Sequence, residues 1–296
     1  MTKAEVGWDL YRSFLAVLDE GSLSGAARAL GLTQPTLGRQ IAALEQALGL
    51  ALFTRSQSGL LPTEAALALR GHAEAIRNTA AALARMAGGL GAEVRGAVRI
   101  SASEVIGIEV LPPILAALRQ AHPQLELELV LSSRLQDLVH READIAVRMV
   151  APRQDVLMAS RVGEVPLGLV AREDYLQRRG VPKRIADLGR HDIIGFDTET
   201  PFLRTARARF ARWERTQFAL RCDSDLAQLA LIRAGAGIGI CQLAVARRDP
   251  QLVHVLPKVF EFPLSTWVAM HSDLRDSPRC RVVFEGLVQG LRRYVG

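Results

Sequence analysis

The chain has 296 residues, of which 49% are hydrophobic and 23% charged, a composition typical of folded globular proteins that excludes a disordered chain. At about 150 residues per domain, this length favours two domains, or a small domain followed by a larger one. The formal net charge is +6, but residues 1–94 hold eight basic and eight acidic residues, so charge alone does not locate a nucleic-acid site there.

The first predicted elements are three short helices within residues 8–61. Gly31 and Gly49 end the second and the third helix, as glycine commonly does just past a helix. Thr33 is a suitable N-cap for the third, and Pro35 falls in its first turn, where a missing amide costs little. Apolar residues repeat at helical spacing in each: Leu10, Phe14, Val17 and Leu18; Leu23, Ala26, Ala27 and Leu30; Leu37, Ile41, Leu44 and Leu48.

The second and third helices have the spacing of a helix-turn-helix, in which the second helix of the motif lies in the DNA major groove. Its apolar side chains face inward, and Gln34, Thr36, Arg39 and Gln40 occupy the exposed start. Gln can pair with adenine, Arg with guanine or phosphate, and Thr with a thymine methyl group. The geometry leaves a second interpretation open, a three-helix packing unit whose polar residues are merely solvated.

An alanine-rich helix is predicted from Thr63 to about Leu90, with Pro62 ending the preceding element and Thr63 as N-cap. A seam repeats along it at three- and four-residue steps: Ala66, Leu69, Ala73, Ile76, Ala80, Leu83 and Ala87. Small alanines permit close approach, so pairing with a second copy is favoured over packing against its own domain. Both interpretations remain open.

After a linker at residues 88–96, strands alternate with helices, which predicts parallel βαβ units. Two such series indicate two α/β lobes. The first has strands at 97–102, 125–131 and 144–149 and helices at 108–121 and 135–141; the second has strands at 192–196, 218–223 and 237–241 and helices at 203–213 and 226–234.

Open parallel sheets bind ligands beyond the carboxyl ends of their strands, where helix N-termini offer free amides. Each residue there is by itself a capping or structural group, and only their convergence points to a binding site. The candidates are Ser101, Ser103, Glu104, Ser132, Ser133, Arg148, Phe196, Asp197, Ser224 and Gln242.

Other patterns carry no further site. The cysteines Cys222, Cys241 and Cys280 show no ligand spacing, and Cys241 is favoured as a small buried side chain over a redox sensor. The arginine run at 204–215 is typical of a solvated helix face. We find no catalytic triad or phosphate loop. Without a signal peptide or an uninterrupted apolar span, we expect a cytoplasmic protein with no membrane segment, no metal and no cofactor.

Residues 21–66, GSLSGAARALGLTQPTLGRQIAALEQALGLALFTRSQSGLLPTEAA, closely resemble the winged helix-turn-helix of the LysR-type transcriptional regulators. The resemblance extends over the whole chain, including SPRCRVVFEGL, which we expect before a last helix. It implies an α-rich winged helix-turn-helix domain (6–63), a dimerisation helix (64–90) and an α/β effector domain (95–296). The effector domain would have two lobes like those of type II periplasmic binding proteins, lobe I at 95–163 and 267–296 and lobe II at 164–266.

The resemblance also assigns DNA-binding residues. Three positions depart from the family pattern: Gly38 stands where a serine is usual, Ser58 near a usual basic residue, and Ala66 at a usual glycine. We therefore expect fewer phosphate contacts than is typical, and the absent side chain of Gly38 suggests a closer approach of backbone to DNA. The implied DNA-binding residues are Thr33, Gln34, Pro35, Thr36, Gly38, Arg39 and Gln40, with Arg55 in the wing.

The implied function is a sequence-specific DNA-binding regulator controlled by a small-molecule effector held between the lobes. Its partners would be double-stranded DNA, the effector and further copies of the chain as a dimer or homotetramer, with RNA polymerase a further partner to consider. The chemical class of the effector depends on the orientation of Glu104. If Glu104 faces the cleft, the effector would be an amine or a polyhydroxyl compound. If Glu104 faces out, a carboxylate paired with Arg148 or Arg134 stays possible. The alternatives are a two-lobed binding module without a DNA role and, less favoured, an enzyme on the same fold.

Overall fold

The computed structural model describes residues 6–56, 59–88, 93–132, 138, 141–152, 156–199, 204 and 214–295. The chain forms two compact units. One comprises Met1–Ala87 with His140–Glu142, and the other comprises Gly88–Val139 with Ala143–Gly296.

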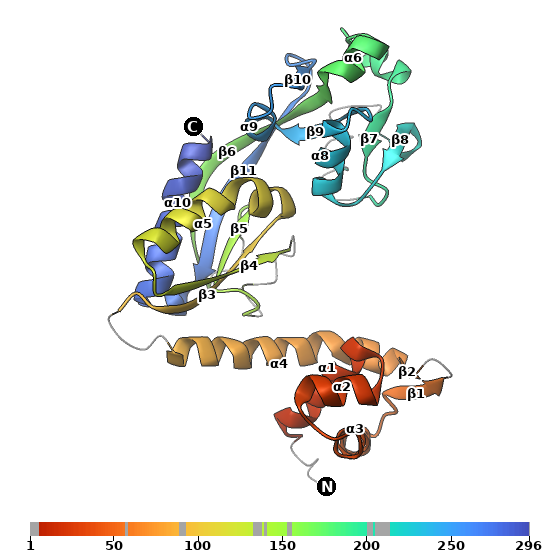
Figure 1. The fold of residues 1–296 in the computed structure, drawn as a ribbon, viewed down its shortest axis with the longest axis vertical. Helices are drawn as coiled ribbons and strands as arrows, with labels where there is room; N and C mark the ends of the chain where they lie inside the picture. The colour runs from red at the N-terminus through yellow and green to blue at the C-terminus, as the bar shows by residue number, and fades with distance from the viewer. Residues whose placement is uncertain are drawn as a thin grey trace. The chain divides into compact units, whose positions relative to one another are not determined.

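The N-terminal unit is a winged helix-turn-helix followed by a long helix (Figure 1). Helices α1 (Trp8–Glu20), α2 (Leu23–Leu30) and α3 (Gln34–Leu48) precede strands β1 (Phe53–Ser56) and β2 (Gly59–Pro62), which pair antiparallel to form the wing. Helix α4 (Glu64–Gly88) follows. The three predicted helices and the long helix are therefore confirmed.

Local chemistry accounts for the helix boundaries. Gly21, Gly31 and Gly49 all have positive φ angles of 65° to 69° at the ends of α1, α2 and α3, a conformation that favours glycine. The Thr33 side chain accepts a hydrogen bond from the Thr36 amide, and Thr63 accepts one from the Ala66 amide. Both predicted N-caps are confirmed.

One hydrophobic core holds this unit together. It includes Phe14 and Val17 of α1, Leu37 and Leu44 of α3, and Ala66 of α4, all at most 1% exposed. Phe14 also packs against Phe53 of the wing, with ring centroids 5.8 Å apart. The three helices and the wing therefore share one apolar interior, which fixes the orientation of α3.

The seam of α4 divides into two halves. Ala66 and Ala73 are buried against the N-terminal core, and Leu69 packs beside it. Ile76 and Leu83 are 42% and 63% exposed. Packing on the chain's own domain therefore accounts for the first half only, and pairing with a second copy stays a prediction for the exposed half.

The second unit is built on one nine-stranded sheet with the order β4-β3-β5-β11-β6-β9-β7-β8, with β10 also pairing β6. Strands β3 (Gly96–Ala102), β4 (Leu125–Leu131) and β5 (Ile145–Arg148) run parallel in lobe I. Strands β7 (Ile193–Gly195), β8 (Phe218–Arg221) and β9 (Ile238–Gln242) run parallel in lobe II. The two predicted α/β lobes are confirmed.

Two long strands join the lobes (Figure 1). Strand β6 (Leu157–Arg172) pairs with β11 (Glu261–His271) from Leu157 to Gly168. Its C-terminal part also pairs with β9 and with β10 (Leu252–Val255). Thr266 pairs with Gly163 and Trp267 with Arg161, so the register shifts between them. This β-bulge lies at Trp267, where the pairing of β11 with β5 ends. A β-bulge bends the strand that contains it.

Helices cover the sheet in both lobes. In lobe I, the π-helix η1 (Ile106–Val110) leads into α5 (Leu111–Ala121), which packs beside α10 (Pro278–Val295). A Cβ added at Gly286 would lie 2.6 Å from Leu118, so glycine allows the two helices to approach closely. In lobe II, α8 (Asp225–Arg233) packs on β9, β6 and β7. There α6 (Glu173–Arg179) contacts β6, and α9 (Leu243–Ala246) contacts β6, β9 and β10.

The observed bounds differ from the predicted ones in a few places. Residues 277–287, expected before a last helix, are themselves the start of α10 apart from Ser277. The predicted helix at 108–121 begins with a π-helical turn at Ile106. The predicted helices at 135–141 and 203–213 lie mostly outside the described residues. Short 3₁₀ helices complete the described elements: η2 (Ile185–Arg190), η3 (Arg215–Gln217) and η4 (Ser272–Leu274).

Candidate nucleic-acid interface and interlobe site

Helix α3 has one apolar face and one exposed polar face. Leu37, Ile41 and Leu44 are buried, and Thr33, Gln34, Pro35 and Arg39 are exposed. Because the apolar face is fixed by the core, the polar face at the start of the helix is presented in a defined orientation. A helix with this arrangement can enter a major groove.

The polar side chains at the start of α3 are linked to one another. The hydroxyl groups of Thr33 and Thr36 lie 2.8 Å apart, and Arg39 Nη2 donates to Thr36 Oγ1 at 3.5 Å. Ser24 of α2 donates to Gln34 Oε1 at 3.0 Å. These contacts restrict the rotamers of the residues predicted to read DNA, which lowers the entropy lost on binding.

Gln40 is half-buried and has a partner within the N-terminal unit, and its predicted role in DNA binding stays a prediction. Its Oε1 accepts a hydrogen bond of 2.7 Å from Ser13 Oγ, and Ser13 is 1% exposed. The Gln40 amide therefore joins α3 to α1. A buried hydroxyl needs a partner, and Gln40 supplies it.

The wing is anchored to the helices on both of its strands. Glu45 Oε1 accepts hydrogen bonds from the Leu52 and Phe53 amides, and the Leu60 amide donates to the Gly21 carbonyl oxygen. Arg55 is exposed on β1. Ser58, the second position considered in the wing, lies outside the described residues.

The interlobe site brings together several predicted residues in pairs. In lobe I, Arg148 Nη2 donates to Ser101 Oγ at 2.7 Å, and both residues are buried, at 7% and 1% exposure. Arg148 Nη1 also donates to the Val147 carbonyl oxygen. The guanidinium group therefore lies at the carboxyl ends of β3 and β5, where the sequence placed it.

Glu104 faces lobe II, which settles its orientation. Its Oε2 accepts a hydrogen bond of 2.6 Å from Ser224 Oγ and one of 3.3 Å from the Leu226 amide at the start of α8. The predicted residues Glu104 and Ser224 are thus joined across the lobes. The carboxylate holds the amide that a free helix N-terminus would offer to an anion.

A second interlobe contact involves residues that the sequence did not single out. Arg233 at the end of α8 donates to both carboxylate oxygens of Glu109, at 2.6 and 2.9 Å. Arg248 Nη1 donates to the Glu109 carbonyl oxygen at 2.7 Å. The hydrogen bond from Arg233 lowers the pKa of Glu109. No pattern marked Glu109, because a lone acidic residue near a helix start is common.

Other predicted residues of this site have local partners. Tyr294 donates a hydrogen bond of 2.6 Å to Gln242 Oε1, which joins α10 to β9. Ser103 is half-buried, and its carbonyl oxygen accepts from the Gly107 amide. The Ser132 amide donates to the Ala102 carbonyl oxygen, which extends the β3–β4 pairing. Ser133 lies outside the described residues.

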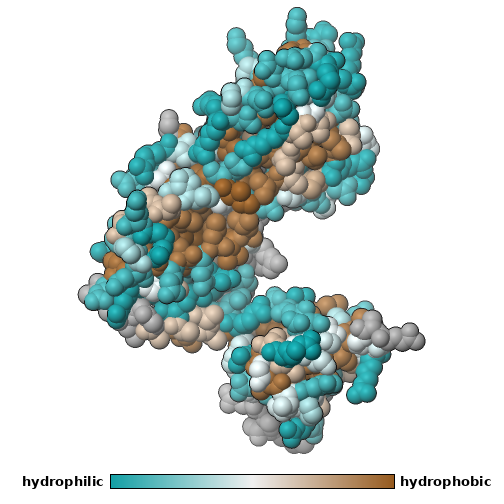
Figure 2. Space-filling model, viewed as in Figure 1, coloured by the Kyte–Doolittle hydropathy of each residue, from teal (hydrophilic) through white to brown (hydrophobic). Residues whose placement is uncertain are grey.

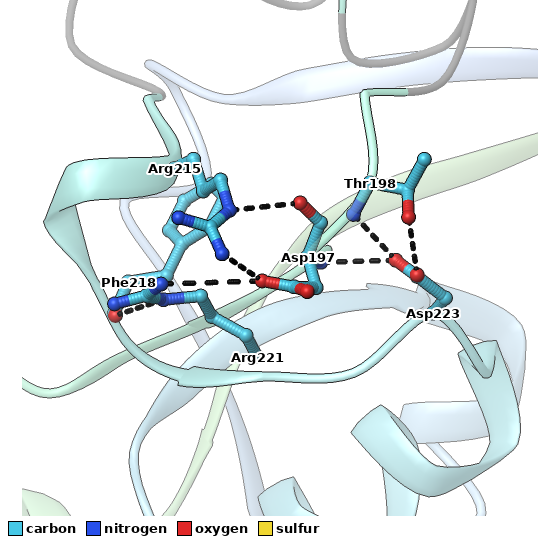
Figure 3. Close-up of polar contacts among 6 residues, drawn as sticks. All are labelled: Asp197, Thr198, Arg215, Phe218, Arg221 and Asp223. Carbon is cyan, nitrogen blue, oxygen red and sulfur yellow. Dashed lines mark hydrogen bonds and ion pairs between the residues drawn. The ribbon is translucent and has the colours of Figure 1, made fainter.

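Asp197 and Phe196 are engaged within lobe II. Figure 3 shows Asp197 held by Arg215, whose Nη2 lies 2.6 Å from Asp197 Oδ1. Asp223 accepts from the Asp197 amide and from the Thr198 amide and hydroxyl, and the Thr198 hydrogen bonds lower the pKa of Asp223. Phe196 packs against the lobe II core. These contacts join the loops after β7 and β8 to each other.

Cys241 is 5% exposed, and burial raises its pKa to about 12. A thiol with that pKa is protonated at neutral pH and is a poor nucleophile, which favours the structural interpretation. Arg204 and Arg215 are the only two arginines of the predicted run that fall within the described residues. Within that described part of the chain, there is no metal-binding cluster and no helix long and apolar enough to cross a membrane.

Two family models match the chain. Residues 8–67 match the bacterial regulatory helix-turn-helix protein of the lysR family, and residues 91–292 match the LysR substrate binding domain. The chain therefore belongs to the LysR family of DNA-binding transcriptional regulators, with a helix-turn-helix domain and a substrate-binding domain.

Relatives of this class match over nearly the whole chain. The probable HTH-type transcriptional regulator LtrA of Klebsiella pneumoniae is 26% identical over 93% of this chain and 91% of its own length. PtxR of Pseudomonas aeruginosa is 28% identical over 96% and 91%. Solved structures share the fold: CrgA of Neisseria meningitidis with a TM-score of 0.60 at 22% identity, covering 97% of this chain and 99% of that chain. CbnR complexed with its target DNA has a TM-score of 0.67 at 21% identity, with the same coverage.

Proposed function

We propose that this regulator reads DNA with the start of α3, using Thr33, Gln34, Thr36 and Arg39. The observation that carries this proposal is the fixed polar face of α3 over a buried apolar face. Arg39 supplies the positive charge of this polar face, and Arg55 on the wing would contact a phosphate. Pro35 and Gly38 would contribute shape, and Gln40 would position α3 through Ser13. The alternative of a binding module without a DNA role leaves this face unexplained.

The effector would bind between the lobes, near the residues that already meet there. We assign residues 6–63 to the DNA-binding domain, 64–90 to the dimerisation helix and 95–296 to the effector domain. Lobe I would comprise 95–163 and 267–296, and lobe II 164–266. The β-bulge at Thr266 and Trp267, opposite Gly163, supports a hinge at these bounds. The chain would act in the cytoplasm by binding, and not as an enzyme.

Assembly would use two exposed apolar surfaces, one in each unit. On α4 these side chains are Ile76 and Leu83, which share one face of the helix on the predicted seam. On the effector domain they are Ile108, Leu129 and Leu131, and Figure 2 shows a hydrophobic area over this part of lobe I. Exposed patches of this kind mark interaction sites, and a homodimer or a homotetramer would cover them. A regulator that activates transcription would also contact RNA polymerase.

Footprinting of the full chain on the DNA upstream of its own gene tests the proposal. Arg39→Ala should weaken binding about 5- to 150-fold, since a good bidentate contact to a base contributes roughly 1–3 kcal/mol. Arg190→Ala is the matched control, because Arg190 is exposed in lobe II. No protection by the wild-type chain at low salt, or equal protection by the Arg39 variant, would contradict it.

A further inference from the structure

Helix α8 of lobe II is attached to lobe I at both of its ends. Ser224, its N-cap residue, and Leu226 in its first turn contact Glu104. Arg233, its last residue, contacts Glu109. Both glutamates belong to one segment of lobe I that includes the π-helix Ile106–Val110. Two attachments on one helix prevent the rotation that either contact alone would allow.

The contact at the N-terminal end is of the kind that an anionic ligand makes. The first amides of a helix have no intrahelical acceptor and carry partial positive charge. The Leu226 amide is one of them, and Glu104 Oε2 accepts from it and from the Ser224 hydroxyl. Ser224 Oγ in turn accepts from the Ala227 amide, so the cap and the interlobe contact share one hydroxyl group.

The surroundings of Glu104 oppose this contact to some extent. Burial and the negative charge of Glu104 raise the pKa of Asp225, the first residue of α8. Asp225 is exposed, so solvent weakens the effect of burial and also screens its repulsion with Glu104. Glu104 therefore binds at α8 beside a like charge, and its position depends on the hydrogen bonds from Ser224 and Leu226.

The contact at the C-terminal end of α8, between Arg233 and Glu109, has the more favourable hydrogen-bond geometry. The Arg233 guanidinium group forms two parallel hydrogen bonds with Glu109, whose side chain is 18% exposed. Bidentate pairs of this kind are strong and specific in direction. Arg248 holds the backbone of the same residue through the Glu109 carbonyl oxygen and lies 5.2 Å from the centre of the Tyr294 ring.

We propose that Glu104 and Glu109 form a two-point latch that holds the lobes together without a ligand, and that an effector acts by displacing Glu104 from the start of α8. This inference rests on the proposed effector site between the lobes. Because Glu104 and Glu109 already hold the two lobes together, an effector does not need to bring the lobes together. It competes with Glu104 for the Ser224 hydroxyl and the Leu226 amide, while Glu109 and Arg233 keep the far end in place.

Hydrogen exchange of the Leu226 amide in the full chain tests the latch without any effector. Glu104→Gln should speed this exchange by roughly 5- to 10-fold, because a neutral amide oxygen accepts a weaker hydrogen bond than a carboxylate does. Glu109→Gln should also speed it, because loosening the far end of α8 weakens a two-point attachment. Glu285→Gln is the matched control: Glu285 is an exposed partner of Arg281 within α10 and should leave the exchange unchanged.

Exchange in Glu104→Gln within twofold of wild type would overturn the latch. Exchange that responds to Glu104→Gln but not to Glu109→Gln would reduce the contact to a local helix cap and overturn the two-point arrangement. The DNA footprint of Glu104→Gln tests the regulatory part, and we expect it to differ from wild type without an effector. An identical footprint contradicts regulation by the latch, whereas no footprint for either protein contradicts the proposed function and leaves the exchange result standing.

Discussion

Gly38 lies on α3 with open space beside it. A Cβ added there would meet only Leu23 Cδ1, at 3.9 Å, which is an ordinary contact. Glycine inside a helix costs about 0.5–1 kcal/mol relative to alanine. Gly38→Ala should therefore raise the free energy of unfolding of the N-terminal unit by about that amount, which calorimetry of the full chain measures as a higher melting temperature.

The same variant decides whether Gly38 serves DNA binding. If the backbone at Gly38 approaches DNA closely, the added methyl group weakens binding although the protein becomes more stable. Gly71→Ala on α4 is the control, because a Cβ added at Gly71 would have no atom within 4 Å. Equal gains in stability with unchanged DNA affinity in both variants would show that the close-approach hypothesis for Gly38 is wrong.

At the scale of single residues, sequence reasoning placed side chains better than it assigned their partners. The buried Leu37 and the N-cap Thr33 follow from helical spacing and turn chemistry, and both are confirmed. The half-buried Gln40 accepts a hydrogen bond from the hydroxyl group of Ser13, 27 positions earlier in the chain, a partner that the sequence did not indicate. Asp197 pairs with Arg215 in a similar way. Such partners depend on tertiary packing, which periodicity does not encode.

The pairing of η1 with α8 gives a prediction at the scale of elements. The folded-state pKa of Glu109 lies below its ordinary value of 4.5, so ionised Glu109 stabilises the folded chain. This contribution is fully present above pH 4.5 and is lost as the pH falls through the lower folded-state value. Urea unfolding at a series of pH values should show Glu109→Gln less stable than wild type by roughly 1–3 kcal/mol at pH 7. The difference should shrink below pH 4.5.

Glu285→Gln provides the comparison for this series. Glu285 and Arg281 are 68% and 65% exposed, and surface pairs of this kind contribute about 0–1 kcal/mol. A loss at pH 7 no larger for Glu109→Gln than for Glu285→Gln would contradict a stabilising Glu109–Arg233 pair. A difference that stays constant down to pH 3 would instead assign the effect to packing and not to charge.

The βαβ alternation located most elements of the sheet, because short apolar runs bounded by turn residues mark parallel strands. The prediction for 125–131 coincides with β4. The long strands β6 and β11 were not predicted. They cross from one lobe to the other, and burial changes along β6: none of its first eight residues is buried, whereas six of the next seven are. A strand with two environments has no single period.

At the scale of the whole molecule, each unit carries its own exposed apolar surface. Leu83 of α4 is 63% exposed, and Leu129 of β4 is 37% exposed at the edge of the sheet. If α4 forms one interface and lobe I a second, two independent contacts per chain build a dimer of dimers. One type of contact alone would close at a dimer. The sequence predicted the α4 seam, but the surface on lobe I required the sheet order.

Light scattering of the full chain after size-exclusion chromatography tests these two surfaces. We expect a wild-type mass about four times the chain mass of 32.3 kDa. Leu129→Glu should halve that mass while the dimer still binds DNA, because a buried charge opposes the lobe I contact and leaves α4 intact. Leu83→Glu should break the α4 contact and weaken DNA binding, since the two α3 helices would no longer be held as a pair. Val181→Glu, at a side chain 60% exposed in lobe II, should change neither. A tetramer that survives Leu129→Glu would exclude β4 from the interface, and a monomeric wild-type chain would contradict both surfaces.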